Sequence, residues 1–197
     1  MNCEEIWKAF TNAFLSKNPC KIAEEDYQPL IKMVKQSLPC NKILFWSKTK
    51  TLAHDYTKDH KDMFTLENTL LGYMFDNLTW CGDAGKTEMN YKSCPVCSSS
   101  AVNVFWKAAS KALAETACGV VYVMLSGSIK NAFDPNSVFG SVEVVNLNPN
   151  KVRSLQAWVM TDIGGVARDS CSGSSINELE SILKQKSIQF TCLDDYK

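Results

Sequence analysis

The sequence has little histidine, no excess of charge of either sign and no long apolar run, and each shortage excludes a class of function. His54 and His60 are its two histidines, which leaves a zinc centre few nitrogen ligands. Lysine plus arginine numbers 21, as does aspartate plus glutamate, whereas a nucleic-acid-binding surface needs clustered excess base. No apolar run approaches the roughly 18–20 residues of a membrane span. We therefore expect no metal site, no nucleic-acid partner and no membrane-spanning segment in this chain.

The start of the chain does not resemble a secretory leader. Met1 is followed at once by the polar segment Asn2-Cys3-Glu4-Glu5, so we expect no signal peptide here. The 197 residues are 45% hydrophobic and 21% charged, a composition typical of globular and not of disordered proteins. This length accommodates one large domain or two small lobes.

Cysteine, by contrast, is abundant and dispersed. The nine cysteines are Cys3, Cys20, Cys40, Cys81, Cys94, Cys97, Cys118, Cys171 and Cys192. So many in a chain of this size indicate disulfides and an oxidising compartment. We expect an ectodomain whose targeting segment has been trimmed away, and in which one cysteine has lost its partner. The composition leaves a reduced intracellular protein as the alternative.

Hydrophobic periodicity predicts helices in the first part of the chain and a mixture of helices and strands later. The first expected helix includes Ile6, Trp7, Phe10 and Phe14 and ends before Pro19. Further helices are expected over 24–38, 49–60, 64–77 and 102–118, with another beginning at the capping-box pattern 175–178. The expected strands cover 42–46, 120–125, 141–145, 155–160 and 188–191. Strands that alternate with crossovers favour a parallel sheet. The pattern therefore predicts an α/β protein with a helical lobe beside a parallel-sheet lobe.

One acidic residue stands out in the predicted strand at 141–145. Glu143 lies among Val142, Val144 and Val145 in the segment FGSVEVVNL, although glutamate is depleted in strands and rarely buried without a partner. It could be an exposed side chain on a sheet with one solvated face. It could also line a cleft, where a carboxylate near aromatic rings would suit glycosidic-bond chemistry.

Cys94-Pro95-Val96-Cys97 has the spacing of a redox couple, but two other interpretations stay open. A redox motif of this type normally follows a buried strand, whereas polar residues precede it here. A zinc site would need a second pair of ligands. The third interpretation is that the two cysteines belong to separate structural disulfides.

The tryptophans and two further acids also allow two interpretations. Trp46 ends a predicted strand, where a parallel sheet offers a ligand crevice, and Trp106 lies on a predicted helix; either could bind a ligand or pack in the core. Trp7 and Trp158 are expected to pack in the core.

Glu67 and Asp76 are nine residues apart, which places them on opposite faces of one unbroken helix. Their side chains converge only if that helix ends near residues 72–75.

Several segments together resemble the ADP-ribosyl cyclase family, most closely its vertebrate members. They are 40–47 (CNKILFWS), 64–73 (FTLENTLLGY), 78–82 (LTWCG), 90–95 (NYKSCP), 104–107 (VFWK) and 139–144 (FGSVEV). They occur in the family's order, and the likeness runs from about Cys3 to Tyr196. It implies an ADP-ribosyl cyclase-like α/β fold with a four-stranded parallel sheet. In this fold residues 1–39 and 65–117 form a helical lobe, and residues 40–64 and 118–197 form an α/β lobe. The two lobes are expected to have a cleft between them and to act as one intertwined catalytic unit.

The resemblance also implies an activity. The family cleaves the nicotinamide–ribose bond of NAD through an oxocarbenium-like intermediate, giving ADP-ribose or cyclic ADP-ribose; members also hydrolyse the cyclic product and exchange the base of NADP. By this resemblance Glu143 is the catalytic glutamate, and Trp106 stacks on the nicotinamide, with Trp46 as the second aromatic of the cleft. Glu67 and Asp76 match acids that hold the carboxamide, and Glu67 also matches the position that biases cyclisation against hydrolysis.

Four more positions match the family's pyrophosphate contacts, and two of them depart from its pattern. Ser47, Lys48 and Phe139 fall where the family contacts the pyrophosphate. Val138 stands where close relatives carry threonine, so a hydroxyl is missing. Lys48 stands where arginine is usual, and a lysine offers a point charge instead of a bidentate fork. Both departures predict weaker phosphate binding without loss of the chemistry.

The family's disulfides carry over residue by residue. The implied pairs are Cys20–Cys97, Cys40–Cys118, Cys81–Cys94 and Cys171–Cys192, with Cys3 unpaired. Further expectations are no cofactor, since NAD is the substrate, small nucleotide ligands, an extracellular or cell-surface location, and a monomer or weak homodimer. The alternatives are a receptor-like ectodomain with weak or lost catalysis, and a thiol oxidoreductase using Cys94 and Cys97.

Overall fold

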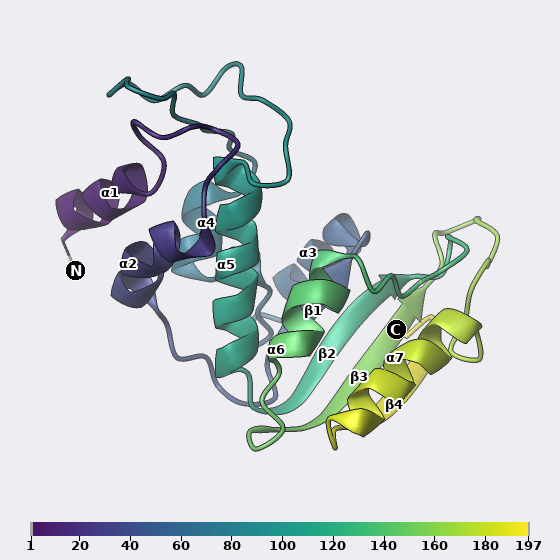
Figure 1. Cartoon of the computed structure of the whole chain (residues 1–197). Helices are drawn as coiled ribbons and strands as arrows, with labels where there is room; N and C mark the ends of the chain where they lie inside the picture. Colours follow the sequence, from purple (N-terminus) through teal and green to yellow (C-terminus); the bar gives the residue numbers. More distant parts are fainter. Residues whose placement is uncertain (1, 197) are drawn as a thin grey trace. The chain divides into compact units, whose positions relative to one another are not determined.

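In the computed structural model, which describes residues 2–196, four parallel strands form one sheet in the order β1-β2-β3-β4 (Figure 1). They are β1 (Leu44–Ser47), β2 (Gly119–Ser126), β3 (Val152–Met160) and β4 (Gln189–Asp194). The middle strands are rich in buried apolar residues, as is typical of parallel sheets covered on both faces. The predicted α/β fold with a four-stranded parallel sheet is confirmed.

The chain divides into two compact units, each made of two separate stretches. Met1–Gln36 and Glu67–Ala112 form the first, called here the helical unit, and Ser37–Leu66 and Leu113–Lys197 form the second, called here the sheet unit. In the sheet unit, α3 (Lys50–Asp59) contacts β1, and α7 (Ser174–Gln185) packs against β4, the edge strand opposite β1 (Figure 1). Two short helical segments, η2 (Phe139–Glu143) and α6 (Val144–Asn146), lie between β2 and β3 in the sequence.

The strand predicted at 141–145 is wrong, because the segment is helical. Residues Phe139–Glu143 form one turn of π-helix that continues directly into α6. Its valines fit a strand locally, but β2 and β3 already pair with each other in parallel. The chain between two adjacent parallel strands must return across a face of the sheet, usually as a helix. Tertiary pairing therefore overrides the β propensity of this segment.

The helical unit is held together by aromatic side chains. Its helices are α1 (Cys3–Asn12), α2 (Glu24–Val34), α4 (Leu70–Phe75) and most of α5 (Ala101–Thr116). Phe10 stacks on Phe75 with ring centroids 4.4 Å apart. The buried Tyr27 hydroxyl donates a hydrogen bond to the Ala101 carbonyl oxygen (2.8 Å) and accepts one from the Trp80 indole (3.0 Å). These bonds satisfy polar atoms that burial would otherwise penalise.

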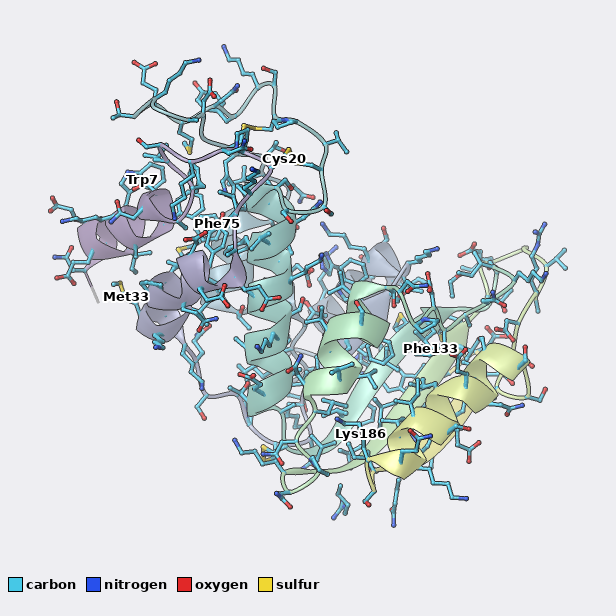
Figure 2. The ribbon with its side chains drawn as sticks, viewed as in Figure 1. Trp7, Cys20, Met33, Phe75, Phe133 and Lys186 are labelled. Atoms are coloured by element: carbon cyan, nitrogen blue, oxygen red, sulfur yellow. A yellow bond between two sulfur atoms is a disulfide. The ribbon has the colours of Figure 1, made fainter. Side chains whose placement is uncertain are left out.

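Four disulfides link cysteines within the units. They are Cys20–Cys97, Cys40–Cys118, Cys81–Cys94 and Cys171–Cys192, the same pairs that the family resemblance implied. Figure 2 labels Cys20 of the first pair. Cys3 is free and exposed. Because Cys94 and Cys97 belong to different disulfides, the redox and zinc interpretations of the Cys-x-x-Cys motif are wrong.

Two further observations concern residues 2–196. None of the helices in this range is both long and apolar enough to cross a membrane. Trp158 is buried as expected, but the core position expected for Trp7 is wrong, since 54% of its surface is exposed on α1 (Figure 2).

Candidate active site

The carboxyl end of β1 carries three predicted site residues in succession. Trp46 is half-buried against the core cluster that includes Leu44 and Trp158. Ser47 ends the strand, and Lys48 follows in the left-handed backbone region with φ of 55°. Non-glycine residues seldom adopt this conformation, and they do so mainly at turns and functional sites. The position fits a ligand crevice at the carboxyl ends of parallel strands.

The turn after β1 is anchored to the neighbouring strand. The hydroxyl of Thr49, which is 6% exposed, donates a hydrogen bond to the Met124 carbonyl oxygen on β2 at 2.8 Å. This bond fixes the point at which the chain leaves β1 and enters α3. The backbone that presents Ser47 and Lys48 is thereby tied to the neighbouring strand.

Glu143 lies at the end of the π-helix η2 and is only 7% exposed. Burying a carboxylate is costly, so proteins seldom do it without a structural or chemical reason. Single turns of π-helix are themselves rare and are frequent at functional sites. The π-helix packs against β1 through the ring pair Phe45–Phe139, whose centroids are 6.1 Å apart. Glu143 is therefore presented by a rigid helical turn and not by a strand.

Phe139 and Val138 differ in what they can offer a ligand. The Phe139 ring is 1% exposed and packs between Phe45 and Phe133, each at 6.1 Å. Its side chain therefore belongs to the core, which leaves its backbone as the group that could meet a phosphate. The Val138 side chain is 40% exposed and carries no hydrogen-bonding atom.

The helix predicted over 64–77 is broken into two pieces. A 3₁₀ turn, η1, covers Leu66–Asn68, and α4 begins after Thr69, whose hydroxyl accepts a hydrogen bond from the Gly72 N–H at 3.1 Å. Glu67 lies on the 3₁₀ turn, and Asp76 caps the carboxyl end of α4. The opposite-face argument for these two acids therefore does not apply. Both side chains are half-buried.

Trp106 lies on α5 at the margin of the helical unit's core. Its neighbour Phe105 is fully buried, and the two rings meet edge-on at 5.0 Å. Trp106 itself is half-buried, because consecutive residues on a helix point in different directions. An indole that keeps an accessible face can stack on a planar cationic ring.

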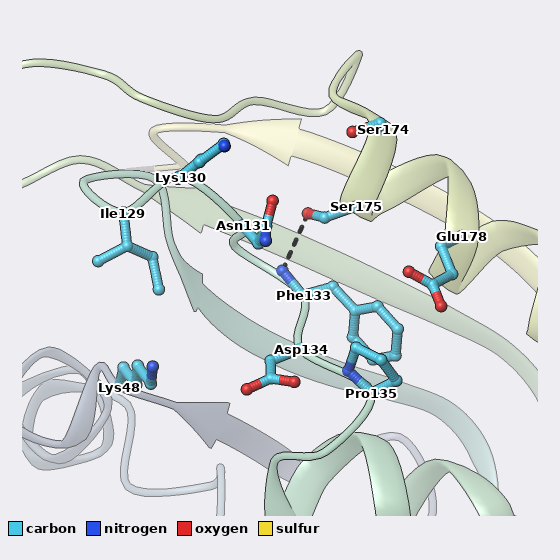
Figure 3. Close-up of a pocket in the computed structure, with 10 residues that line it drawn as sticks. All are labelled: Lys48, Ile129, Lys130, Asn131, Phe133, Asp134, Pro135, Ser174, Ser175 and Glu178. Atoms are coloured by element: carbon cyan, nitrogen blue, oxygen red, sulfur yellow. Dashed lines mark hydrogen bonds between the residues drawn. The ribbon is translucent and has the colours of Figure 1, made fainter.

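The sheet unit also holds a pocket that the sequence did not reveal (Figure 3). Its volume is about 490 Å³. It is lined by Lys48, Ile129, Lys130, Asn131, Phe133, Asp134, Pro135, Ser174, Ser175 and Glu178. Only Lys48 was among the predicted site residues. The other lining residues come from the loop after β2 and from the first turns of α7, which no sequence pattern connects.

Comparison with known proteins places the chain in a family. A family model described as ADP-ribosyl cyclase matches residues 1–197. The chain is 58% identical to ADP-ribosyl cyclase/cyclic ADP-ribose hydrolase 1 of Oryctolagus cuniculus, covering all of this chain and 67% of that protein. It is 37% identical to the enzyme of Aplysia californica, covering 98% of this chain and 70% of that protein. The chain thus spans about two thirds of the length of these relatives.

Solved structures agree with the sequence comparison. Porcine CD38 in complex with a covalent intermediate, ribo-F-ribose-5'-phosphate, is 57% identical with a TM-score of 0.94, covering all of this chain and 86% of that one. Aplysia cyclase complexed with substrate NGD and product cGDPR is 36% identical with a TM-score of 0.93, covering 100% of this chain and 79% of that one. The chain therefore belongs to the ADP-ribosyl cyclase family.

Proposed function

We propose that this chain cleaves the nicotinamide–ribose bond of NAD and releases ADP-ribose, cyclic ADP-ribose or both. The ribosyl carbon passes through an oxocarbenium-like intermediate, which meets either water or the adenine of the same substrate. Hydrolysis of cyclic ADP-ribose and base exchange on NADP use the same intermediate. The observation that carries the proposal is Glu143, a carboxylate buried on a π-helix in a chain of this family.

Glu143 stabilises the positive charge that develops at the ribosyl carbon. A carboxylate held in a partly dry site interacts with that charge more strongly than one in water, and its position costs no reorganisation during the reaction. The covalent intermediate on the porcine relative supports capture of the ribosyl carbon by an enzyme group. In this chain Glu143 is the candidate for that group.

The other residues bind and orient the substrate. Trp106 stacks on the nicotinamide ring, where a pyridinium over an indole gains about 1–2 kcal/mol, and Trp46 is the second aromatic contact. Glu67 and Asp76 accept hydrogen bonds from the carboxamide, and Glu67 influences the balance of cyclisation and hydrolysis. Since these residues come from both units, we propose that residues 1–39 and 65–117 act with 40–64 and 118–197 as one catalytic unit.

The pyrophosphate is bound by groups at the carboxyl end of the sheet. Ser47 offers a hydroxyl, Lys48 a charge and Phe139 its backbone, while Val138 leaves one hydrogen bond unmade. The reaction needs no cofactor in this proposal, because NAD is itself the substrate. The four disulfides support an extracellular or cell-surface location, and we expect a monomer or weak homodimer.

Incubation with NAD followed by chromatographic separation of nicotinamide, ADP-ribose and cyclic ADP-ribose tests the proposal. We expect nicotinamide release by the wild-type chain and a loss of about 100-fold or more in kcat for Glu143→Gln, the scale seen when one stabilising group is removed from an active site. Glu180→Gln on α7 is the matched control, because Glu180 is exposed. Near-full turnover by Glu143→Gln would show that the assigned role is wrong. Folded wild-type protein without NAD turnover would instead favour a receptor-like ectodomain, the alternative that Val138 suggests.

A further inference from the structure

The pocket of the sheet unit lies beside the proposed pyrophosphate contacts but contains none of the proposed catalytic groups. Lys48 lines it, whereas Glu143, Trp46 and Phe139 do not. Its volume of about 490 Å³ is within the range of small-molecule sites, roughly 300–1,000 Å³. It opens where the loop after β2 meets the amino-terminal turn of α7 (Figure 3), and the carboxyl ends of parallel strands are a common place for ligands.

The wall of the pocket is fixed by a hydrogen-bond network. The Asp169 carboxylate accepts bonds from the Ala132 N–H (2.8 Å) and the Ser175 hydroxyl (2.5 Å). The Ser175 oxygen in turn accepts the Phe133 N–H at 3.1 Å (Figure 3). Ser175 was expected to cap α7, but Gly173 is the N-cap and Ser175 lies inside the first turn. Its hydroxyl ties the helix to the loop instead, so the pocket is preformed.

The charged side chains that line the pocket form no ion pairs among the residues that the structure describes. Lys48, Lys130, Asp134 and Glu178 line it, and across residues 2–196 none of the four takes part in an ion pair. The Asp134 carboxylate accepts a hydrogen bond from the nearby Asn136 N–H at 2.8 Å. In Figure 3 Lys130 and Asn131 reach out from the loop on the side of Ser174 and Ser175. Two cationic and two anionic groups therefore face a common space.

The two lysines and two carboxylates of the pocket favour a ligand that has both an anionic group and hydroxyl groups. Lysine ammonium groups bind phosphate as point charges, and the N-terminus of a helix adds to the attraction for an anion. Carboxylates repel phosphate but accept hydrogen bonds from hydroxyl groups. A bare phosphate therefore fits the pocket poorly, and a neutral sugar leaves the two lysines unused. A molecule that carries a phosphate next to vicinal hydroxyls satisfies both kinds of group.

We propose that the pocket binds a phosphorylated ribose. Lys130 and the amino-terminal turn of α7 hold the phosphate, and Glu178 accepts the ribose hydroxyls. The phosphorylated ribose can come from either of two sources. One is the adenosine end of the dinucleotide substrate, whose pyrophosphate meets Lys48; this source rests on the proposed function. The other is a separate nucleotide that binds beside the active site.

Calorimetric titration of the full chain with ribose 5-phosphate, 5'-AMP, ribose and inorganic phosphate tests the proposal. We expect ribose 5-phosphate and 5'-AMP to bind more tightly than ribose or phosphate alone. Lys130→Gln and Glu178→Gln should each weaken their binding about tenfold or more, the scale of one hydrogen bond to a charged group. Lys184→Gln and Glu180→Gln make the same charge changes at exposed positions of the same helix and should leave binding unchanged. Binding that neither Lys130→Gln nor Glu178→Gln alters would overturn the proposal.

Kinetics with NAD distinguish the two sources. If Lys130→Gln raises KM with little change in kcat, and 5'-AMP competes with NAD, the pocket takes the adenosine end of the substrate. If 5'-AMP binding depends on Lys130 while KM does not, the pocket takes a separate nucleotide. Both results support the site. Absence of NAD turnover would contradict the proposed function. The titration would still show whether the pocket binds a phosphorylated ribose.

Discussion

The carbonyl oxygen of Asp134 lies 2.5 Å from the place where a Cβ atom on Gly140 would stand, and Cα of Pro135 lies 2.8 Å from it. Both are too close for a real side chain. The turn at 134–137 therefore rests directly on the π-helix that ends at Glu143. The Ser137 hydroxyl adds a contact by accepting the Gly140 N–H at 3.0 Å.

Gly140→Ala should displace this helix and with it the catalytic carboxylate. We expect a loss of about 1–3 kcal/mol in the free energy of unfolding, the usual cost of overpacking, and a fall in kcat for NAD. Urea unfolding and steady-state kinetics measure the two effects. Asn136→Ala is the control, because this exposed residue uses only its backbone N–H in the same turn. Unchanged kcat in Gly140→Ala would show that the close contact does not position Glu143.

Val138→Thr should strengthen substrate binding. The side chain is 40% exposed, so a hydroxyl can be added without burying an unpaired polar group. One new hydrogen bond to the pyrophosphate is worth about 1 kcal/mol, which is about a fivefold lower KM for NAD. Val145→Thr makes the same exchange at another exposed position and should leave KM as it is. A KM for Val138→Thr equal to the wild-type value contradicts the phosphate contact expected at this position.

Asp169→Ala should destabilise the sheet unit by removing the acceptor for several donors. The Ala132 N–H, the Ser170 N–H and the Ser175 hydroxyl all lose their bonds to this carboxylate. A buried donor left without a partner costs about 1–3 kcal/mol. Urea unfolding should therefore show a lower midpoint, while Asp162→Ala, on an exposed carboxylate, should not. An unchanged midpoint for Asp169→Ala would mean that water replaces the carboxylate without loss.

The disulfide between Cys40 and Cys118 should contribute more to the free energy of unfolding than the free Cys3 does. The bridge joins residues 78 positions apart, and closing a long loop restricts the unfolded chain. We expect the double variant Cys40→Ala, Cys118→Ala to lose about 2–5 kcal/mol in the free energy of unfolding. Cys3→Ser should unfold like the wild type, since Cys3 is exposed and unpaired. Chemical denaturation under non-reducing conditions makes the comparison.

Stability should fall at alkaline pH because of Tyr27. Burial raises the pKa of its hydroxyl well above the usual 10.0; the Trp80 hydrogen bond opposes this shift, and the Asp26 charge adds to it. The raised pKa means that the stabilising contribution is complete below pH 10 and is lost as the pH rises towards the folded-state pKa, because only the unfolded state releases the proton.

The urea midpoint of the wild type should therefore decline as the pH rises above 10. Tyr27→Phe should begin less stable, since the Ala101 carbonyl and the Trp80 indole lose their partner, but it should show a shallower decline. Tyr91→Phe, at an exposed position, is the control. Equal slopes for wild type and Tyr27→Phe would refute the role of this hydroxyl.

The sequence by itself determined the architecture and the family. Apolar runs and strand–helix alternation predicted the parallel sheet, because those patterns reflect burial on both faces. Motifs from 40–47 to 139–144 were enough to indicate the family. Local pattern failed at 139–147, where three valines favour a strand but the pairing of β2 with β3 requires a crossover.

Only the tertiary structure decided how Glu143 is presented and where the pocket lies. Whether a carboxylate is buried depends on what packs over it, and neighbours along the chain do not supply that information. The pocket brings together Lys48, Lys130 and Glu178, which are far apart in the sequence. They meet because parallel strands bring their carboxyl ends to one edge of the sheet, and the Asp169–Ser175 bond holds the loop and the helix together there.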